Sequence, residues 1–570
     1  MYAGLLMSEE ESRHHQFPAA WVASEIQAPD EHMFPRLGAE QIARISAYGH
    51  TRRLADGELV WEAGATNISF FVVLEGSIAI LVGSTEQLVV IHQPGGFTGD
   101  VDMLSGRQAA VRARARGATR VIEVDRDRLR AIVQTDAELS ELLLRAFILR
   151  RVALIASGQG NVVFVGSRHS AGTLRLQEFL TRNGRPYVYV DADHDPSVQG
   201  LLDTFHVGVN DVPVVICWGV RVLKKPTVEE LAECLGLSRL NEDAVRDLAV
   251  VGAGPAGLAA AVYAASEGLD ALVVEAYAPG GQAGSSSRIE NYLGFPTGIS
   301  GQELAGRAFV QAEKFGAEVS VARTATRLDS GRRPYRLELA SGVAVQAKTV
   351  IIATGAEYRT PNIAKLKRLE GLGVYYAATP LEAIRCEGGE VIIVGGGNSA
   401  GQAAVFLAGS ARVVHMLVRG VGLAQSMSRY LIRRIEETPN IELRTKTEIE
   451  AVEGEAHLER VTWVDRATNS RRTVDVRHVF LMTGANPNTK WLGHGVALDG
   501  KGFIKTGADL SAEDLRAAAW PLARAPLLFE TSRPGIFAVG DARAGSIKRV
   551  AAAVGEGSAC VQLVHRVLAE

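Results

Sequence analysis

The sequence predicts a multidomain chain in which a β-rich section and a small α/β section precede two larger α/β domains. Three observations carry this prediction. The chain has 570 residues, whereas a single domain holds roughly 100–200. Residues 31–155 contain short apolar runs punctuated by glycine, which is typical of an antiparallel barrel or roll. Two later segments, 248–267 and 390–408, each place a glycine cluster between a buried-strand pattern and a helical pattern.

The composition argues against several classes of protein. The 61 Lys and Arg residues nearly balance the 64 Asp and Glu residues, so the formal net charge is −3 and the basic excess of a nucleic-acid-binding protein is missing. No apolar run approaches the ~18 residues of a membrane span. The first residues also lack the basic and apolar regions of a signal peptide. We therefore expect a cytoplasmic protein that binds neither nucleic acid nor membrane.

The cysteines point in the same direction. They are too far apart in sequence for a CxxC motif or a zinc knuckle, so we expect reduced thiols and no metal site. The four residues are Cys217, Cys234, Cys386 and Cys560.

The front of the chain reads as an arm and two modules. Residues 1–30 are polar and predict a flexible arm. The β-rich domain, 31–155, opens with an expected helix over 34–48 and closes with helical patterns at 125–134 and 137–156. After a glycine linker at 158–160, residues 160–237 alternate strand and helix patterns. The expected elements there are strands at 162–165, 187–191 and 212–217, and helices at 174–183, 199–205 and 227–235.

The next unit carries a dinucleotide-binding pattern. Gly252, Gly254 and Gly257 form GxGxxG between the strand run 248–251 and a helical run, with Pro255 and Ala256 inside the turn. These glycines suit a tight turn, a close approach to pyrophosphate and close helix–strand packing, and the helix N-terminus favours negative charge. Glu275 ends the following strand, where it accepts hydrogen bonds from ribose hydroxyls and disfavours a 2′-phosphate. The pattern therefore favours FAD or NAD over NADP.

The C-terminal region supports FAD. A strand over 535–539 ends in Gly540 and Asp541, and a helix begins near Arg549 and Val550. Asp541 is suited to a hydroxyl of the ribityl chain. The helix N-terminus is suited to the flavin edge that becomes negative on reduction.

A second glycine cluster predicts a second nucleotide. Gly395, Gly397 and Ala400 form GxGxxA, with Asn398 and Ser399 between them. The next strand ends in Arg419, a cation that favours the 2′-phosphate of NADPH, although NADH stays open. Two such units in one chain indicate hydride transfer from nicotinamide to flavin.

At these residues the chain resembles the low-molecular-weight thioredoxin reductase family over 246–570. The resemblance implies an FAD domain formed by 246–374 and 491–570, an inserted NAD(P)H domain at 375–490, and a homodimer. It also implies that Gln282, Asn291 and Asp541 contact FAD, and we add Gly281, Thr354 and Gly355 to the cofactor-binding set. The matching segments are Gly280–Gln282, Glu290–Pro296, Ala353–Gly355, Gly484–Thr489 and Gly540–Asp541.

One departure from that family changes the expected chemistry. Where members carry Cys-Ala-Thr-Cys and an acid, residues 376–381 read Tyr-Ala-Ala-Thr-Pro-Leu. Without a dithiol there is no relay to a protein disulfide. Gly420 and Ala424 also replace arginines usual in the family, with Arg429 or Arg433 as candidate substitutes. Cys386 is expected to be an inert buried cysteine rather than a thiol facing the flavin.

The two front modules also carry resemblances. Residues 54–64, 70–76 and 95–100 make 31–155 similar to a cyclic-nucleotide-binding domain. Asp100 stands where that family has a glutamate for the ribose. The arginine expected for the cyclic phosphate falls near Ala109, with Arg107 as the nearest cation. The module therefore either binds a cyclic nucleotide or serves as a docking or dimerisation domain.

Residues 160–237 resemble a thioredoxin or glutaredoxin fold. Val212-Pro213 stands at the cis-proline position and Ser167-Arg-His-Ser170 at the CxxC position, so this module is expected to be a redox-inactive scaffold.

Two functions remain at this point. The first is a flavoprotein oxidoreductase that moves hydride from NAD(P)H to FAD and on to an external acceptor, which is a quinone, dioxygen, a ferredoxin-like protein or a disulfide. The second is a redox- or nucleotide-sensing regulator on the same scaffold. A third, weaker hypothesis adds a separate CxxC protein that completes thioredoxin reduction.

Overall fold

A computed structural model describes residues 30–82, 86–156, 162–168, 170–193, 208, 211–217, 221–286, 288–289, 291–359, 361–370, 372–376, 378, 380–483 and 485–570. Several predicted features lie outside these residues: the 158–160 linker, the 199–205 helix, His169, Glu290 and Gly484. The expected arm also lies outside them, except for its last residue, Asp30. The chain divides into two compact units. The first contains residues up to 167 together with 184–236, and the second contains 168–183 and 237–570.

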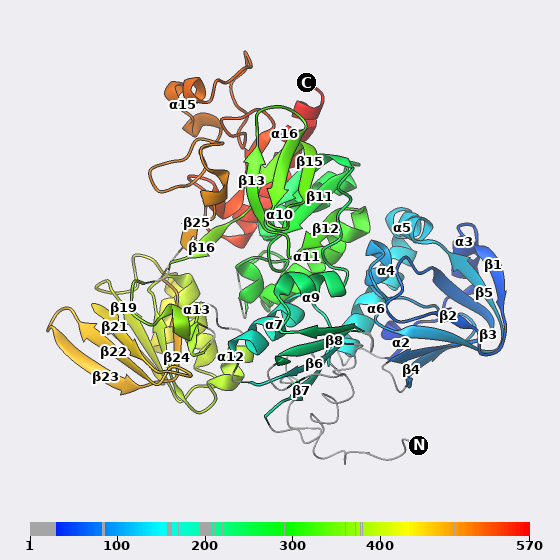
Figure 1. The fold of residues 1–570 in the computed structure, drawn as a ribbon, viewed down its shortest axis with the longest axis horizontal. Coiled ribbons are helices and arrows are strands. Elements are labelled where there is room, and N and C mark those ends of the chain that lie inside the picture. Colours follow the sequence, from blue (N-terminus) through cyan, green and yellow to red (C-terminus); the bar gives the residue numbers. More distant parts are fainter. Residues whose placement is uncertain are drawn as a thin grey trace. The chain divides into compact units, whose positions relative to one another are not determined.

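The first part of unit 1 is an antiparallel roll (Figure 1). Its strands run in the order β1-β5-β3-β4, with β2 also paired to β5. The rings of Phe70, Phe97 and Phe147 meet in its core, with centroids 5.8–6.3 Å apart. The strands are β1 His50–Leu54, β2 Leu59–Trp61, β3 Phe70–Val82, β4 Gln87–His92 and β5 Arg112–Val124. The helices are α2 Asp30–Met33, α3 Ala39–Ser46, α4 Asp102–Ser105, α5 Arg126–Thr135 and α6 Ala137–Ala156.

The expected helix over 34–48 is wrong in extent. Residues 34–38 are not helical, and α3 begins only after Gly38, its N-cap. Pro35 fixes its own φ and disfavours helical backbone in the residue before it, so the chain between α2 and α3 stays extended.

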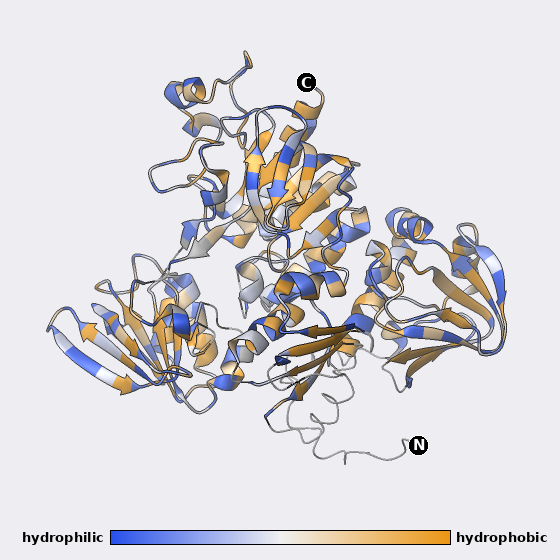
Figure 2. Cartoon of the chain, viewed as in Figure 1, coloured by the Kyte–Doolittle hydropathy of each residue, from blue (hydrophilic) through white to orange (hydrophobic). Residues whose placement is uncertain are grey.

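The rest of unit 1 is a small sheet ordered β7-β6-β8-β9. Strand β6 is parallel to β7 and antiparallel to β8. Figure 2 shows β6 and β8 as hydrophobic along their length, and every residue of β8 is buried. The Val212–Pro213 peptide bond is cis, as the predicted resemblance implies. The elements are β6 Val162–Gly166, β7 Val188–Asp191, β8 Val214–Cys217, β9 Arg221–Lys224 and α9 Val228–Cys234.

Unit 2 begins with α7, Ala171–Arg182, and continues with a seven-stranded sheet. Its order is β12-β11-β10-β15-β14-β13, with β26 beside β15. Strands β12, β11, β10, β15 and β26 are mutually parallel, and α10 packs against α11 and α16. The strands are β10 Val245–Val251, β11 Ala271–Glu275, β12 Glu318–Val321, β13 Ala325–Asp329, β14 Tyr335–Leu339, β15 Ala344–Ile352 and β26 Ile536–Ala538. The helices are α10 Pro255–Ser266, η4 Ala283–Ser285, α11 Gly301–Phe315, η6 Lys490–Leu492, η7 Gly507–Asp509, α15 Ala512–Ala517, η8 Gly540–Ala542 and α16 Val550–Leu568.

The inserted part of unit 2 has a five-stranded parallel sheet ordered β17-β24-β18-β19-β20 and a three-stranded antiparallel sheet β21-β22-β23. The antiparallel pair β16–β25 forms a small sheet of its own. The strands are β16 Ala356–Tyr358, β17 Val374–Tyr375, β18 Glu390–Val394, β19 Val413–Val418, β20 Ile441–Thr445, β21 Thr447–Glu453, β22 Arg460–Asp465, β23 Ser470–Asp475, β24 His478–Leu481 and β25 Ala485–Pro487. The helices are η5 Lys367–Leu369, α12 Pro380–Arg385, α13 Asn398–Leu407 and α14 Arg429–Glu436.

None of the helices in the described part of the chain combines the length and apolarity needed to cross a membrane.

Candidate functional site

The predicted FAD residues gather at one edge of the seven-stranded sheet. Strands β11, β10, β15 and β26 are neighbouring and parallel, so their carboxyl ends meet at one edge. Each is followed by part of the predicted site, and ligands of open α/β sheets bind at this edge. The residues placed there are Gly252–Gly257 after β10, Glu275 at the end of β11, Thr354 and Gly355 after β15, and Gly540 and Asp541 after β26.

The turn after β10 depends on two glycines that no other residue can replace. Gly252 has φ +104°, and a Cβ on it would lie 2.5 Å from the carbonyl oxygen of Ala353. A Cβ on Gly257 would lie 1.8 Å from the carbonyl oxygen of Gly252. The positive φ at Gly252 and the short contacts at both positions exclude a side chain at either glycine. The turn therefore passes tightly against the loop after β15, and the first turn of α10 packs directly on Gly252.

Gly254 differs from these two glycines because its surroundings within the protein are open. It is the N-cap of α10, with φ −70°, and an ideal Cβ would meet only the Cα of Gly281, at 4.0 Å. A Cβ on Gly281, where φ is +54°, would in turn lie 3.1 Å from the Cα of Gly254. The two glycine backbones thus face each other in front of a helix N-terminus. This glycine cradle, Gly254 and Gly281, fits a pyrophosphate that needs backbone N–H groups and no side chain in the way.

Glu275 is a buried carboxylate with three backbone donors. Its Oε2 accepts from the N–H of Ala253 at 2.7 Å, and its Oε1 accepts from Tyr277 and Ala278 at 2.8 and 3.2 Å. Each carboxylate oxygen has two lone pairs, so Oε1 is fully used and Oε2 can still accept one hydroxyl proton. The hydrogen bonds fix the carboxylate beside the first turn of α10, the position predicted for a ribose contact.

Gly540 and Asp541 lie against the same helix N-terminus. A Cβ on Gly540 would lie 3.0 Å from the Cβ of Ala256 in the first turn of α10. Burial raises the pKa of Asp541, and the positive charge of Lys548 opposes that shift. Lys548 donates to the carbonyl oxygen of Asp541 at 2.7 Å. Lys548 is thus a structural support of this turn.

Helix α16 packs on α10 through small residues, which aligns the two helices. A Cβ on Gly557 would lie 2.1 Å from the carbonyl oxygen of Ala256. Further along, Gln562 and His565 of α16 reach Glu267 at 3.3 and 2.9 Å. Because the contacts advance in the same direction along both helices, α10 and α16 run parallel. The N-terminus of α16, with Arg549 as its N-cap, therefore faces the same side as that of α10, and both partial positive charges favour an anionic ligand there.

The remaining predicted FAD residues, Gln282, Thr354 and Asn291, differ in their hydrogen bonds. Gln282 donates from its side chain to the carbonyl oxygen of Ala356, and Thr354 donates to that of Asn488 at 2.7 Å. The loop that carries Gln282 is thus joined to the loop after β15. Asn291 is exposed and, within the described part of the chain, makes no hydrogen bond that joins it to the others. The structure brings the predicted set together except for Asn291.

The second glycine cluster repeats the geometry of the first. Gly395 has φ +145°, and a Cβ on it would lie 2.3 Å from the carbonyl oxygen of Met482. Gly397 is the N-cap of α13, and the nearest atom to its ideal Cβ is 3.9 Å away. Ala400 is fully buried, as expected for the residue that packs the helix on the strand. This site therefore has the same open N-cap glycine in front of a helix N-terminus.

The side chains around this second helix N-terminus are polar. Asn398 accepts from the backbone N–H of Ser428 at 2.8 Å, and Ser426 donates to the carbonyl oxygen of Gly396 at 2.8 Å. Ser399 and Arg419 are exposed, and Arg419 follows the last residue of β19. Arg433 pairs loosely with Glu437 at 3.9 Å. Arg419 is thus an exposed cation at the carboxyl end of β19, and its contact with a 2′-phosphate stays a prediction.

No dithiol occupies the segment before this cluster. Tyr376, Ala378 and Pro380 are described there, and Pro380 begins α12. Cys386 has no exposed surface and belongs to the core of the inserted domain. Burial raises the pKa of its thiol to about 12, so it is not a thiolate at neutral pH.

Two arrangements were missed by the sequence reasoning. Helix α7 contacts the loop that holds the glycine cradle, because Arg182 donates to the carbonyl oxygen of Gly281 at 2.8 Å and Gln302 donates to that of Thr181 at 2.8 Å. In unit 1, Cys217 and Cys234 share a side-chain hydrogen bond although they are distant in sequence. A short-range motif search identifies neither, since both depend on how strands and helices pack.

Comparison with known proteins agrees with this geometry. Residues 246–557 match the family described as pyridine nucleotide-disulphide oxidoreductase, and residues 51–136 match the cyclic nucleotide-binding domain. Thioredoxin reductase of Bacillus subtilis (strain 168) is 32% identical over 333 residues, which cover 58% of this chain and 97% of that protein. NADH dehydrogenase of the same organism is 30% identical over 340 residues, covering 58% of this chain and 61% of that protein. The crystal structure of T. acidophilum thioredoxin reductase is 26% identical, with a TM-score of 0.50, and covers 57% of this chain and 99% of that one.

Proposed function

The chain belongs to the pyridine nucleotide-disulphide oxidoreductase family, and on that premise we propose that it is an FAD-dependent NAD(P)H oxidoreductase that passes electrons to an external acceptor without an internal dithiol. One combined observation carries the proposal. The chain has two open N-cap glycines, Gly254 and Gly397, and it has no cysteine pair at 376–381. The first feature supports two dinucleotides, and the second removes the usual sulfur relay. The cyclic-nucleotide-binding-like domain precedes this oxidoreductase part.

The residues of the first site fit FAD. The glycine cradle and the aligned N-termini of α10 and α16 supply N–H groups and partial positive charge to a pyrophosphate. Glu275 accepts from ribose hydroxyls, and Asp541 accepts from the ribityl chain. Bound FAD supplies a group that accepts hydride and releases electrons singly or in pairs. The protein contributes orientation and a fixed electrostatic environment.

The residues of the second site fit a nicotinamide dinucleotide. Gly395, Gly397 and Ala400 let α13 approach the pyrophosphate, and Ser399 stands exposed beside it. Arg419 offers a positive charge to a 2′-phosphate, which favours NADPH over NADH. The donor preference rests on this one residue, because glycine and alanine replace the other arginines usual in the family.

The absence of a reactive sulfur restricts the exit route of the electrons. Cys386 lies in a core with a raised pKa, so its thiol neither attacks a disulfide nor forms a thiolate next to a flavin. Electrons therefore leave the flavin directly. A quinone, dioxygen, a ferredoxin-like protein or an external disulfide fits this route, and the chain acts as a homodimer by analogy with the family.

Anaerobic stopped-flow spectroscopy tests the proposal. Purified protein loaded with FAD is mixed with NADPH or NADH, and each candidate acceptor is then added. The proposal expects rapid bleaching of the visible flavin absorption and fast reoxidation by at least one acceptor. Negligible reduction by both donors would instead favour the redox-sensing regulator. Activity that requires an added CxxC protein would favour a two-component thioredoxin reductase.

A further inference from the structure

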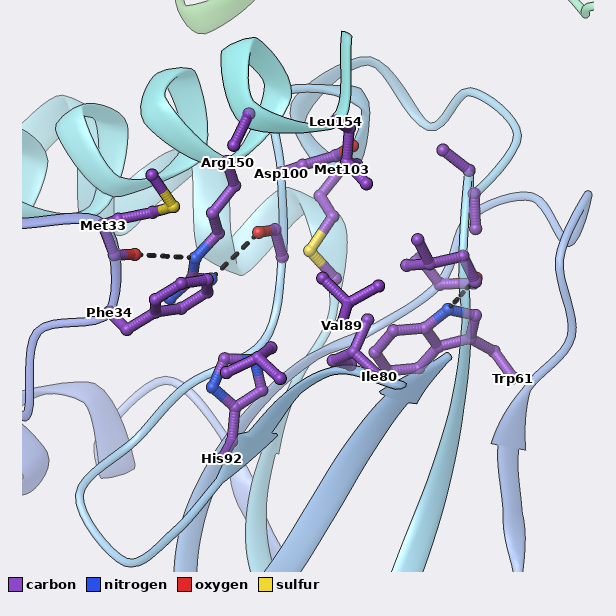
Figure 3. Close-up of a pocket in the computed structure, with 17 residues that line it drawn as sticks. Met33, Phe34, Trp61, Ile80, Val89, His92, Asp100, Met103, Arg150 and Leu154 are labelled. Carbon is purple, nitrogen blue, oxygen red and sulfur yellow. Dashed lines mark hydrogen bonds between the residues drawn. The ribbon is translucent and has the colours of Figure 1, made fainter. Parts of the chain in front are cut away.

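The antiparallel roll of unit 1, together with α6, lines a partly open cavity of about 260 Å³ (Figure 3). Its wall is mostly hydrocarbon and aromatic, with a few polar groups at one end. Because liquid water takes about 30 Å³ per molecule, the space holds a small organic molecule with on the order of ten non-hydrogen atoms. The apolar wall includes Phe34, Trp61, Ile80, Val89, Met103 and Leu154.

Arg150 on α6 is the one cation among the described residues that line this cavity. It is 7% exposed. Its Nε donates to the carbonyl oxygen of Met33 at 2.9 Å and its Nη1 to that of Gly99 at 3.0 Å. Its Nη2 has no acceptor among the described residues. A nine-tenths-buried guanidinium with an unused N–H group at a cavity wall is strong evidence for a missing acceptor.

The protein compensates the charge of Arg150 only in part, through the negative charge of Asp100, and no carboxylate among the described residues is bonded to it. The carboxylate of Asp100, which also lines the cavity, is bound to Arg151 at 2.8 Å. Phe34 and Phe97 contact the guanidinium at 5.2 and 4.6 Å and offer only ring faces. Burial lowers the pKa of Arg150 to about 9, and burial together with Arg150 lowers that of His92 to about 3. His92 is therefore neutral, and a bound anion would add to the partial compensation that Asp100 gives Arg150.

The cavity lacks the groups that the cyclic-nucleotide prediction requires. Ala109 and Ala110 form its wall where a phosphate-binding arginine was expected. Arg107, the predicted substitute, is buried away from this wall, with its charge acting on Asp102. Asp102 also binds Arg185 at 2.9 Å. The two carboxylates are thus held by arginines, and Asp100 is not free to bind a ribose.

We propose that this cavity binds a small apolar monocarboxylate, whose carboxylate accepts from Nη2 of Arg150 while its hydrocarbon body packs against Trp61, Ile80 and Met103. A carboxylate supplies the acceptor that Nη2 of Arg150 lacks, and its negative charge suits a guanidinium. The apolar wall supplies affinity for a hydrocarbon body but nothing for a purine's polar edge or a sugar's hydroxyls. The ligand contact comes from α6, outside the cassette that precedes β5.

The test uses the full chain and 2-naphthoate as probe, measured by isothermal titration calorimetry. Three comparisons accompany it: 2-naphthol, which has the same body without the carboxylate, 3′,5′-cyclic AMP, and competition between the two anions. We expect 2-naphthoate to bind with one site per chain and at least ~10-fold more tightly than 2-naphthol, since a charge-assisted hydrogen bond is lost in the phenol.

Variants assign the binding to this cavity. Arg150→Met should weaken 2-naphthoate at least ~10-fold while leaving 2-naphthol little changed, and Arg150→Lys should restore part of the difference. Arg145→Met, an exposed position on the same helix, is the matched control and should bind normally. Ala153→Phe fills part of the cavity while keeping Arg150 and should abolish binding of both probes. If Arg150→Met does not fold, the Ala153→Phe result and the preference for 2-naphthoate over 2-naphthol decide the matter.

Three results would overturn the proposal. The first is that 2-naphthoate does not bind the full chain. The second is that folded Arg150→Met or Ala153→Phe binds 2-naphthoate as tightly as the unchanged protein. The third is that cyclic AMP binds more tightly than 2-naphthoate and displaces it.

Discussion

Substituting Gly254 with alanine should separate cofactor binding from folding. At φ −70° alanine is unstrained, and its methyl group would meet only the Cα of Gly281, at 4.0 Å. The fold should lose about 1 kcal/mol or less, the cost of replacing glycine by alanine at an N-cap. The methyl group would nevertheless stand in the glycine cradle, where the proposed pyrophosphate approaches the N–H groups.

The size of the effect follows from the contact that is removed. Losing one charge-assisted hydrogen bond from backbone N–H to phosphate costs about 1.5–3 kcal/mol, which weakens FAD binding roughly 10- to 150-fold. The assay is the dissociation constant of FAD from the apoprotein, followed by quenching of flavin fluorescence, with the midpoint of thermal unfolding measured on the same apoprotein samples.

Two matched glycines make the result decisive. Gly306 lies in α11 with no atom within 4 Å of its ideal Cβ, so Gly306→Ala should bind FAD normally and be slightly more stable. Gly257→Ala places a methyl group 1.8 Å from a carbonyl oxygen and should damage the fold itself. Wild-type FAD affinity in Gly254→Ala, or unfolding as severe as that of Gly257→Ala, would refute the reasoning.

Three further predictions address the donor site, the helix pair and the inserted domain. Arg419→Ala should raise KM for NADPH by roughly tenfold and leave KM for NADH nearly unchanged; equal effects on both donors would argue against a 2′-phosphate contact. Gly557→Ala should lower the free energy of unfolding by about 1–3 kcal/mol through overpacking, whereas Gly555→Ala, which meets no atom within 4 Å, should not destabilise the protein; chemical denaturation measures both. Burial lowers the pKa of His478 to about 4, so the unfolded chain binds the proton first as pH falls below about 6.5 and stability declines between that pH and about 4. His478→Phe should flatten this part of the stability–pH curve, and an unchanged slope would contradict the burial of a neutral imidazole.

The sequence predicted the parts of the site that depend on neighbours along the chain. The turn at Gly252–Gly257 and its repeat at Gly395–Ala400 were predicted because a buried strand, a glycine cluster and a helix follow one another directly. The apposition of Gly254 with Gly281 was not predicted, since it depends on how a later loop folds back over the first turn. The same reason explains the missed contact of Arg182 with that loop.

In the cyclic-nucleotide-binding-like domain, the sequence pattern did not identify the cation that lines the cavity. The family pattern places the ligand cation in the cassette before β5, where the sequence offers only Arg107, near Ala109. The cation that lines the cavity is Arg150, on the closing helix, which no local spacing connects to the cassette. The helix predicted over 34–48 is wrong in extent because Pro35 and Gly38 disfavour continuous helical backbone, although the apolar periodicity runs through them.

Reductive titration under anaerobic conditions tests the central claim most directly. Dithionite is added stepwise to the FAD-loaded protein, with a Cys217→Ala variant in parallel so that the Cys217–Cys234 pair of unit 1 contributes nothing. The account predicts complete bleaching at about two electrons per bound flavin in both proteins. Uptake of about four electrons by the Cys217→Ala variant would reveal a second two-electron centre beside the flavin and contradict direct electron transfer to an external acceptor.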